Sequence, residues 1–194
     1  MTPLAPHAAA AAAALLAAAA GPAAANGYDA ALRDLAEAQL RAIAADPAVV
    51  DAIRARNARP DLSPAEIEAL DADWRAQVGA AEAPLVAEIA AAPASARLAE
   101  ARDASRGLLT EIFAMDRQGL NVAISDPTSD YWQGDEAKWR ETFRVGPEAV
   151  HVSEVEFDES TQTYQAQVSL AVPDPESGAP IGAVTFGVNV EFLE

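Results

Sequence analysis

The sequence contains no cysteine, one lysine and only two histidines in 194 residues. Without cysteine the chain forms no disulfide and performs no thiol chemistry. Its histidines, His7 and His151, are too few for a His-rich zinc site, and no nucleophile-elbow motif accompanies His151. We therefore expect no enzyme, no catalytic residue and no cofactor. One catalytic alternative stays open, because 30 acidic residues allow many carboxylate pairs that could act as acid and base.

Long apolar runs are missing after the first 25 residues. The one such run, Ala8 to Ala20, is made of thirteen Ala and Leu residues, and a small-residue cleavage site at Ala23-Ala24-Ala25 follows it. This layout is typical of a secretory signal peptide, although no Lys or Arg precedes the run. The run is shorter than the roughly 20 residues that a membrane span needs. We predict a signal peptide at residues 1–25, cleaved near Ala25, and a periplasmic mature chain without a membrane span; an uncleaved anchor is the alternative.

Positive charge is scarce. The chain has 13 basic and 30 acidic residues, all of them after residue 25, and a net charge of −17. Such a polyanion is repelled by nucleic acid and by anionic lipid surfaces, so we exclude both as partners. Acidic surface also keeps an exported protein in solution, so the charge alone does not require a cationic ligand.

Aromatic residues are few and unevenly distributed. Trp74 is the only one between Asp29 and Arg106, where Ala dominates, whereas residues 108–194 hold nine aromatics and many Val and Thr. This contrast predicts helices before Gly107 and mostly strands after it. We predict that residues 26–194 form a single domain, with a helical part at 26–107 and a sheet part at 108–194.

Two helix starts in the first half are marked by capping residues. Asp46-Pro47 combines an N-cap residue with proline at the first helical position. Ser63-Pro64-Ala65-Glu66 is a capping box, in which the hydroxyl and the carboxylate each satisfy a backbone donor. The leucines Leu32, Leu35 and Leu40 lie on one helical stripe. This stripe could form a homodimer or pack on the chain's own sheet, and the sequence leaves both open.

The second half alternates as strands do. Asp116–Gly119 predicts a turn, residues 134–143 a short helix, and the change of phase across Ser153-Glu154 a β-bulge. We predict an α+β fold in which five strands pair antiparallel. The strands are expected at Leu109–Met115, Leu120–Ser125, Val150–Phe157, Tyr164–Val172 and Ile181–Val190.

The segment Asp126–Trp139, here called the aromatic–acidic loop, differs most from the rest of the chain. It holds two of the three Trp, one of the three Tyr, the only Lys and four carboxylates. An aromatic wall beside a carboxylate suits a ligand that carries an amine, through cation–π attraction and a charge-assisted hydrogen bond. The acids of the loop also allow a Ca²⁺ site, although their spacing is not that of an EF-hand.

Several motifs resemble the Cache family, the extracytoplasmic PAS-like sensor domains of bacteria. The resemblance lies in Ile112-Phe113-Ala114-Met115-Asp116, the turn to Gly119, Asp130-Tyr131-Trp132 and the closing strand Ile181–Gly187, and it covers residues 28–194. It implies a five-stranded antiparallel PAS-like sheet packed with N-terminal helices, and a pocket for a small molecule against that sheet. Most family members lie between two membrane spans. This chain ends at Glu194, so it resembles a freestanding, single-module form.

The candidate ligand-binding residues lie mainly in the aromatic–acidic loop, where the resemblance places the pocket. For Trp139 the alternative is a core-facing stripe with Phe143. Thr185 belongs to a row of small and polar residues with Gly187 and Asn189, which either a ligand or a closely packed helix explains. The polar row Gln165, Gln167 and Ser169 lines the pocket or faces water, and we favour water. The candidates are Asp130, Tyr131, Trp132, Trp139 and Thr185, with no metal ligand.

The sequence thus predicts a non-enzymatic sensor module that binds a small molecule such as an amino acid, an amine or an organic acid. Without an output domain of its own, it would pass the signal to a partner such as a membrane receptor or a sensor kinase. The alternative is an interaction module that binds no small molecule and docks on a membrane sensor or transporter.

Overall fold

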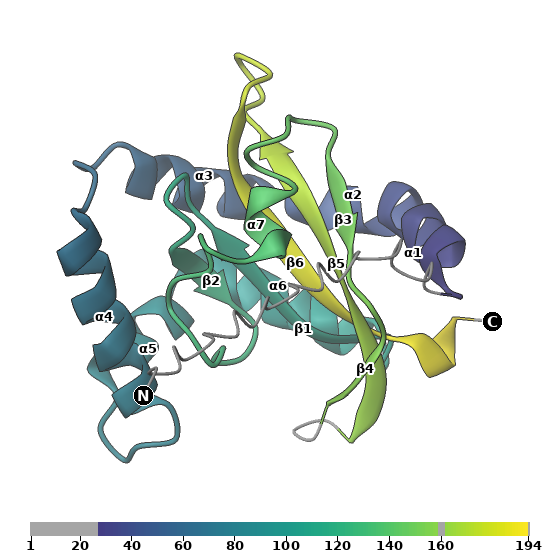
Figure 1. Ribbon diagram of the computed structural model, residues 1–194, viewed down its shortest axis with the longest axis horizontal. Coiled ribbons are helices and arrows are strands. Elements are labelled where there is room, and N and C mark those ends of the chain that lie inside the picture. The colour runs from purple at the N-terminus through teal and green to yellow at the C-terminus, as the bar shows by residue number, and fades with distance from the viewer. Residues whose placement is uncertain (1–26, 159–161, 194) are drawn as a thin grey trace, which may run out of the picture.

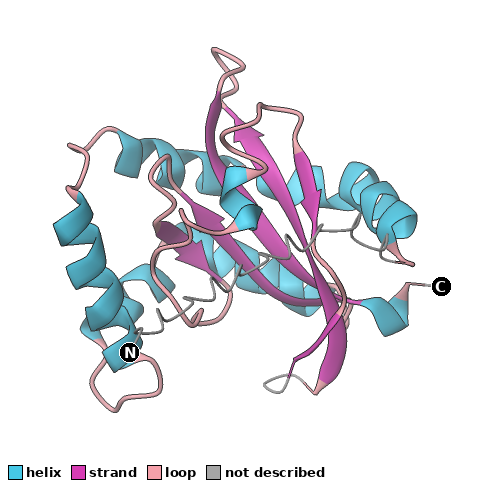
Figure 2. Ribbon diagram, in the orientation of Figure 1, coloured by secondary structure: helices cyan, strands magenta, loops and turns pink. Residues whose placement is uncertain are grey.

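The computed structural model describes residues 27–158 and 162–193. The predicted signal peptide lies outside the described residues. Helices come first in the chain and strands follow, as the composition predicts (Figures 1 and 2). The helices are α1 (Asp29–Leu35), the π-helical turn η1 (Ala36–Leu40), α2 (Arg41–Ala44), α3 (Pro47–Asn57), α4 (Pro64–Gln77), α5 (Pro84–Ala90), α6 (Pro93–Ala104), α7 (Ala137–Arg140) and the 3-10 turn η2 (Val190–Phe192).

Six strands form one antiparallel sheet in the order β2-β1-β6-β5-β3, with β4 also paired to β5. The predicted α+β class and the antiparallel sheet are confirmed, with six strands in place of the five expected. The strands are β1 (Leu109–Met115), β2 (Asn121–Ile124), β3 (Val150–Val152), β4 (Glu156–Asp158), β5 (Thr163–Pro173) and β6 (Pro180–Asn189).

The predicted third strand is divided into β3 and β4 at the expected irregularity. Val152 pairs with Val168, and Glu156 pairs with Gln165. Four steps along β3–β4 therefore correspond to three along β5, so the edge carries one extra residue. An extra residue of this kind bends an edge strand. The short helix α7 is also smaller than the predicted span of 134–143.

One face of the sheet is covered by α1, α2, α3 and α6, which form the larger apolar core. Figure 1 shows α3 and α6 running behind the strands. Leu32 and Leu40 of the N-terminal stripe are almost completely buried there, together with Phe186 of β6. The leucine stripe thus packs on its own sheet.

The opposite face carries a second core under α4, α5, α7 and the aromatic–acidic loop. Trp74 of α4 is fully buried and belongs to the same cluster as Phe113 of β1. Both predicted caps that position the helices are present. Asp46 accepts a hydrogen bond from the Ala48 N–H, and the capping box between Ser63 and Glu66 is complete.

Among the residues that the structure describes, no helix combines the length and the apolar character that crossing a membrane requires.

Candidate functional site

The turn after β1 holds the aromatic–acidic loop in place through backbone contacts. Gly119 has φ of +82°, and a Cβ there would collide with the backbone of Gly134. The Gln133 N–H donates to the Gly119 carbonyl at 2.7 Å. Asp116 orders the turn itself, since its buried carboxylate accepts hydrogen bonds from two backbone N–H groups of the turn. These hydrogen bonds and the close backbone contact fix the position of the loop relative to the sheet.

Tyr131 and Trp132 are fixed to helix α4. Both backbone N–H groups donate to Asp71 Oδ1, at 2.9 and 3.0 Å. The Tyr131 ring stacks on Trp74 with centroids 5.4 Å apart. Trp132 lines a hollow of about 640 Å³ that it shares with α4, and its Nε1 donates to the Gln118 carbonyl. Two of the predicted ligand-binding residues therefore join the loop to α4.

Asp130, Trp139 and Thr185 lie in three separate environments. Asp130 forms an ion pair with Arg75 of α4 at 2.7 Å. Trp139 is buried, stacks on Phe143 at 5.1 Å and donates to the Asp116 carbonyl, so the core-facing stripe predicted as the alternative is present. Thr185 is fully buried in β6, and its hydroxyl lies 3.0 Å from that of Ser169. The structure thus does not bring the five candidates together at one point.

A polar cavity of about 370 Å³ lies under the aromatic–acidic loop, against the face of the sheet that α7 covers. Its walls come from strands β1, β4 and β5, from the loop and from α7. Clefts of 300–1,000 Å³ are the usual size for small-molecule sites. The cavity is lined by Glu111, Phe113, Pro127, Thr128, Ser129, Gln133, Lys138, Asp158, Gln165 and Gln167.

Lys138, the only lysine, reaches into this cavity from α7 with its side chain 14% exposed. Its Nζ lies 2.8 Å from Glu136 Oε2 and 3.2 Å from Gln133 Oε1. The same ammonium stands 5.4 Å from the centre of the Phe113 ring, within cation–π range. The lysine is therefore held by one carboxylate, one amide and one aromatic face.

Glu111 forms the acidic part of the inner wall. Gln167 Nε2 donates to its carboxylate at 3.0 Å. Burial raises the pKa of the Glu111 carboxyl above its usual range, while the hydrogen bond from Gln167 and the charge of Lys138 lower it. A second amide, that of Gln165, accepts from the Thr110 hydroxyl at 2.6 Å and donates to Asp158 at 2.6 Å.

The polar row of β5 differs from the prediction. Gln165 and Gln167 line the cavity instead of facing open water, and Ser169 is fully buried. The row around Gly187 also has a different cause from the closely packed helix that was one of its two explanations. A Cβ at Gly187 would collide with the side chains of Thr110 and Glu111 on the neighbouring strand. Glycine therefore gives Glu111 the space to lie flat against the sheet.

The alternation of side chains along β1 and β5 could have identified these residues from the sequence. Glu111 and Phe113 lie on the same side of β1, and Gln165 and Gln167 on the same side of β5. Polar residues at every second position of a strand whose other face is core point into a common space. The aromatic composition of the loop drew attention to Tyr131 and Trp132 instead.

The acids that allowed a Ca²⁺ site point to different partners. Asp126 forms an ion pair with Arg102, Asp130 with Arg75, and Glu136 with Lys138. Within residues 27–158 and 162–193, no three His, Cys, Asp or Glu side chains converge as metal ligands would. His151, the histidine of the sheet part, has its Nδ1 3.1 Å from Glu141.

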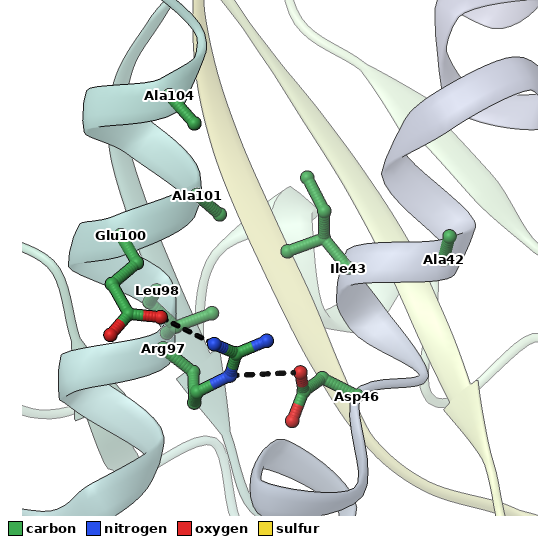
Figure 3. Close-up of a pocket in the computed structure, with 8 residues that line it drawn as sticks. All are labelled: Ala42, Ile43, Asp46, Arg97, Leu98, Glu100, Ala101 and Ala104. Carbon is green, nitrogen blue, oxygen red and sulfur yellow. Dashed lines mark hydrogen bonds and ion pairs between the residues drawn. The ribbon is translucent and has the colours of Figure 1, made fainter.

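A separate hollow of about 390 Å³ lies between α2 and α6, on the opposite side of the sheet from the polar cavity. Figure 3 shows small apolar side chains on its walls, among them Ile43 and Ala101. Arg97 bridges its mouth, with Nε 3.3 Å from Asp46 and a further ion pair to Glu100. Its three charged groups are thus engaged with one another, one arginine with two carboxylates.

No protein-family model and no curated protein matches this sequence. Among solved structures, the chain is similar to the sensor domain of the histidine kinase DctB from V. cholerae, with 11% identity and a TM-score of 0.47 over 86% of this chain and 58% of that one. It is also similar to the sensory domain of the Campylobacter jejuni chemoreceptor Tlp3 with isoleucine bound, with 12% identity and a TM-score of 0.40 over 86% and 62%. A third similar structure is the ligand-binding domain of the Pseudomonas aeruginosa PAO1 amino acid chemoreceptor PctC in complex with GABA, with 18% identity and a TM-score of 0.40 over 65% and 53%. The chain thus spans less than two thirds of the length of each.

Proposed function

We propose that this protein is a sensor module that binds a small molecule in the polar cavity under the aromatic–acidic loop. The observation that supports this most directly is the cavity's lining. A lysine, a half-buried glutamate and two glutamine amides converge on one space beside the apolar ring of Phe113. Polar groups that converge on one space can fix the orientation of a small molecule, and most of the lining of this cavity is polar.

The lining offers both kinds of polar recognition. Glu111 and Asp158 can accept hydrogen bonds from an amine, whereas Lys138 can donate to a carboxylate. The candidate ligands are therefore amines, amino acids and organic acids. Asp130, Tyr131 and Trp132 contribute by fastening the loop that roofs the cavity to α4, so we propose that they act on binding through the position of the loop.

We further propose that the protein acts in the periplasm and passes its signal to a membrane receptor or sensor kinase. The signal-peptide pattern of residues 1–25 and the resemblance to Cache domains motivate both parts. We propose that the signal passes through α4, because Asp71 and Arg75 join this helix directly to the loop that covers the cavity. A ligand that shifts the roof would thereby shift α4.

A ligand screen tests the proposal. The purified protein is melted in the presence of amino acids, amines and organic acids, and each ligand that raises the melting temperature is titrated by calorimetry. We expect at least one class to bind, and Gln167→Ala to weaken its binding about tenfold or more, since the variant leaves Glu111 without its partner. The matched control is Gln39→Ala, at an exposed glutamine on the other side of the sheet, which should bind like the wild type.

A screen in which no class binds would overturn the proposal. A ligand whose affinity changes equally in Gln167→Ala and Gln39→Ala would show that binding occurs outside the cavity. Recovery of a membrane receptor by a protein that binds no ligand would favour the interaction module predicted as the alternative.

A further inference from the structure

The hollow of about 640 Å³ between helix α4 and the aromatic–acidic loop is here called the α4 hollow. Most of the accessible surface of its walls is apolar. Helix α4 contributes one continuous face to it, because residues spaced three and four apart lie on the same side of a helix. These helical residues are Pro64, Ile67, Glu68, Asp71, Ala72 and Arg75.

The α4 hollow is elongated. Its helical wall runs from Pro64 to Arg75, which at 1.5 Å per residue is a length of about 16 Å. An extended chain covers that distance with about five residues. Figure 1 shows α4 at one end of the molecule, where a second protein can approach it. The α4 hollow therefore has the length of a peptide segment, and a molecule of the size of an amino acid would fill only part of it.

Trp132 forms the aromatic wall of the α4 hollow. Its side chain is half-buried, and its Nε1 donates to the Gln118 carbonyl at 2.9 Å. The ring is thus held in place by the loop itself. Ile67 and Ala72 supply apolar surface on the helical wall. A tryptophan of this kind, fixed and partly accessible, is typical of the positions that anchor a protein interface.

The charges of the α4 hollow favour a basic partner. Arg75 is already engaged by two carboxylates, those of Asp71 and Asp130. Glu68 and Asp135 also line the hollow and are exposed, and neither forms an ion pair with any residue that the structure describes. Lysine and arginine bury their methylene stems on apolar surface while their charged ends reach outward. Such side chains match an apolar wall with carboxylates beside it.

We infer that the α4 hollow is the docking site for a segment of the partner protein that carries both apolar and basic side chains. The apolar side chains pack against Trp132 and Ala72, and the basic ones pair with Glu68 and Asp135. Trp132 lines the α4 hollow while Gln133, the next residue, lines the polar cavity, so a ligand that moves the loop alters the docking site. This inference rests on the proposed function and adds to it the surface that meets the partner.

Peptide selection tests the inference. A phage-displayed library of random peptides of about twelve residues, long enough to span the α4 hollow, is selected on the purified protein. We expect the selected sequences to combine Lys or Arg with apolar residues. Synthetic copies are then titrated by calorimetry. Binding should also reduce acrylamide quenching of tryptophan fluorescence, because Trp132 is half-buried whereas Trp74 and Trp139 are buried.

Two pairs of variants locate the peptide. Ala72→Leu should weaken binding about tenfold or more, because the larger side chain occupies the hollow. Ala69→Leu, at an exposed alanine of the same helix outside the hollow, should bind like the wild type. Asp135→Lys should weaken binding about threefold or more by replacing an attractive charge with a repulsive one. Asp51→Lys makes the same change at an exposed acid of α3 and controls for net charge.

Four results would overturn the inference. Equal binding to Ala72→Leu and Ala69→Leu would place the peptides outside the α4 hollow, and selection of neutral or acidic peptides would contradict the charge of the partner. A small molecule whose melting shift is lost in Ala72→Leu and kept in Gln167→Ala would make the hollow a ligand site instead. A library that yields no binding peptide would remove the docking site alone, since the ligand screen tests the sensor proposal separately.

Discussion

The two faces of the sheet are built from the same strands and serve different purposes. Along β5, Ala166, Val168 and Leu170 face the helical core and are almost completely buried. The alternate residues Gln165 and Gln167 face the polar cavity on the other side. One face is closed by apolar packing, while the other is only partly closed by a loop and a short helix.

The difference shows how one sheet supports both an apolar core and a polar cavity. Burial of apolar surface on the helical face contributes about 25 cal/mol for each Å² removed from water. On the opposite face, polar side chains line a cavity and form hydrogen bonds with one another. The first face can therefore hold the sheet in place while the second retains a polar cavity.

The largest effect on stability is expected from removing a large side chain from the core between the sheet and helices α1, α2, α3 and α6. Phe186→Ala should lower the free energy of unfolding by about 3–5 kcal/mol, because it removes a fully buried ring and leaves a cavity. Urea denaturation followed by circular dichroism measures the change. Phe192→Ala is the control, since that ring is 56% exposed and should cost much less. Equal losses in both variants would contradict the assignment of the core.

Asp71→Asn tests the attachment of the aromatic–acidic loop, which covers the polar cavity, to helix α4. The carboxylate accepts two backbone N–H groups of the loop and pairs with Arg75. We expect a loss of about 1–3 kcal/mol in unfolding free energy, because a buried hydrogen-bonded charge is replaced by a neutral amide. The same variant should weaken binding of any cavity ligand. Glu68→Gln, an exposed acid on the same helix, should change neither quantity.

The pH dependence of stability tests the burial of Glu111 in the polar cavity. Because burial raises its folded pKa, the charged form destabilises the native state. This penalty is present in full above the folded pKa and disappears as the pH falls below the ordinary value of 4.5. We therefore expect Glu111→Gln to be more stable than the wild type at neutral pH and equal to it at low pH. Denaturation curves across this range measure the difference, and a constant difference would contradict the prediction.

The smallest effect is expected where the apolar face of β5 reaches solvent. Tyr164 begins the same alternating series as Val168, yet it is 53% exposed and contacts only the edge of Phe157 at 5.2 Å among the aromatic rings. Tyr164→Ser should change the unfolding free energy by less than about 1 kcal/mol. Val168→Ser on the same strand serves as the contrast and should cost several times more, since it places a hydroxyl in the core. Similar losses of unfolding free energy in the two variants would contradict the placement of Tyr164 outside the core.

Local signals in the sequence predicted most of the fold. The capping groups at Asp46 and Ser63 act through the nearest backbone N–H groups, so neighbouring residues are sufficient to identify them. Alternation predicted the strands, and the change of phase predicted the extra residue between β3 and β4. The length of α7 was predicted less well, because its ends depend on packing against the sheet rather than on a cap.

The candidate site was predicted only in outline. The aromatic–acidic loop does roof a cavity, and Lys138 and Gln133 of that loop do line it. The aromatic residues themselves were harder to place, because Tyr131 and Trp132 contact a helix about sixty positions earlier in the chain. Composition within a segment does not report such distant contacts.

The sequence by itself determined the order of helices and strands, the acidic charge and the presence of one unusual loop, because each depends on residues close together in the chain. Only the tertiary structure decided which residues of that loop line the polar cavity. The sheet brings Glu111, Lys138 and Gln167 together from three separate elements. Their meeting depends on strand register and on the space left by Gly187, which are properties of the assembled sheet.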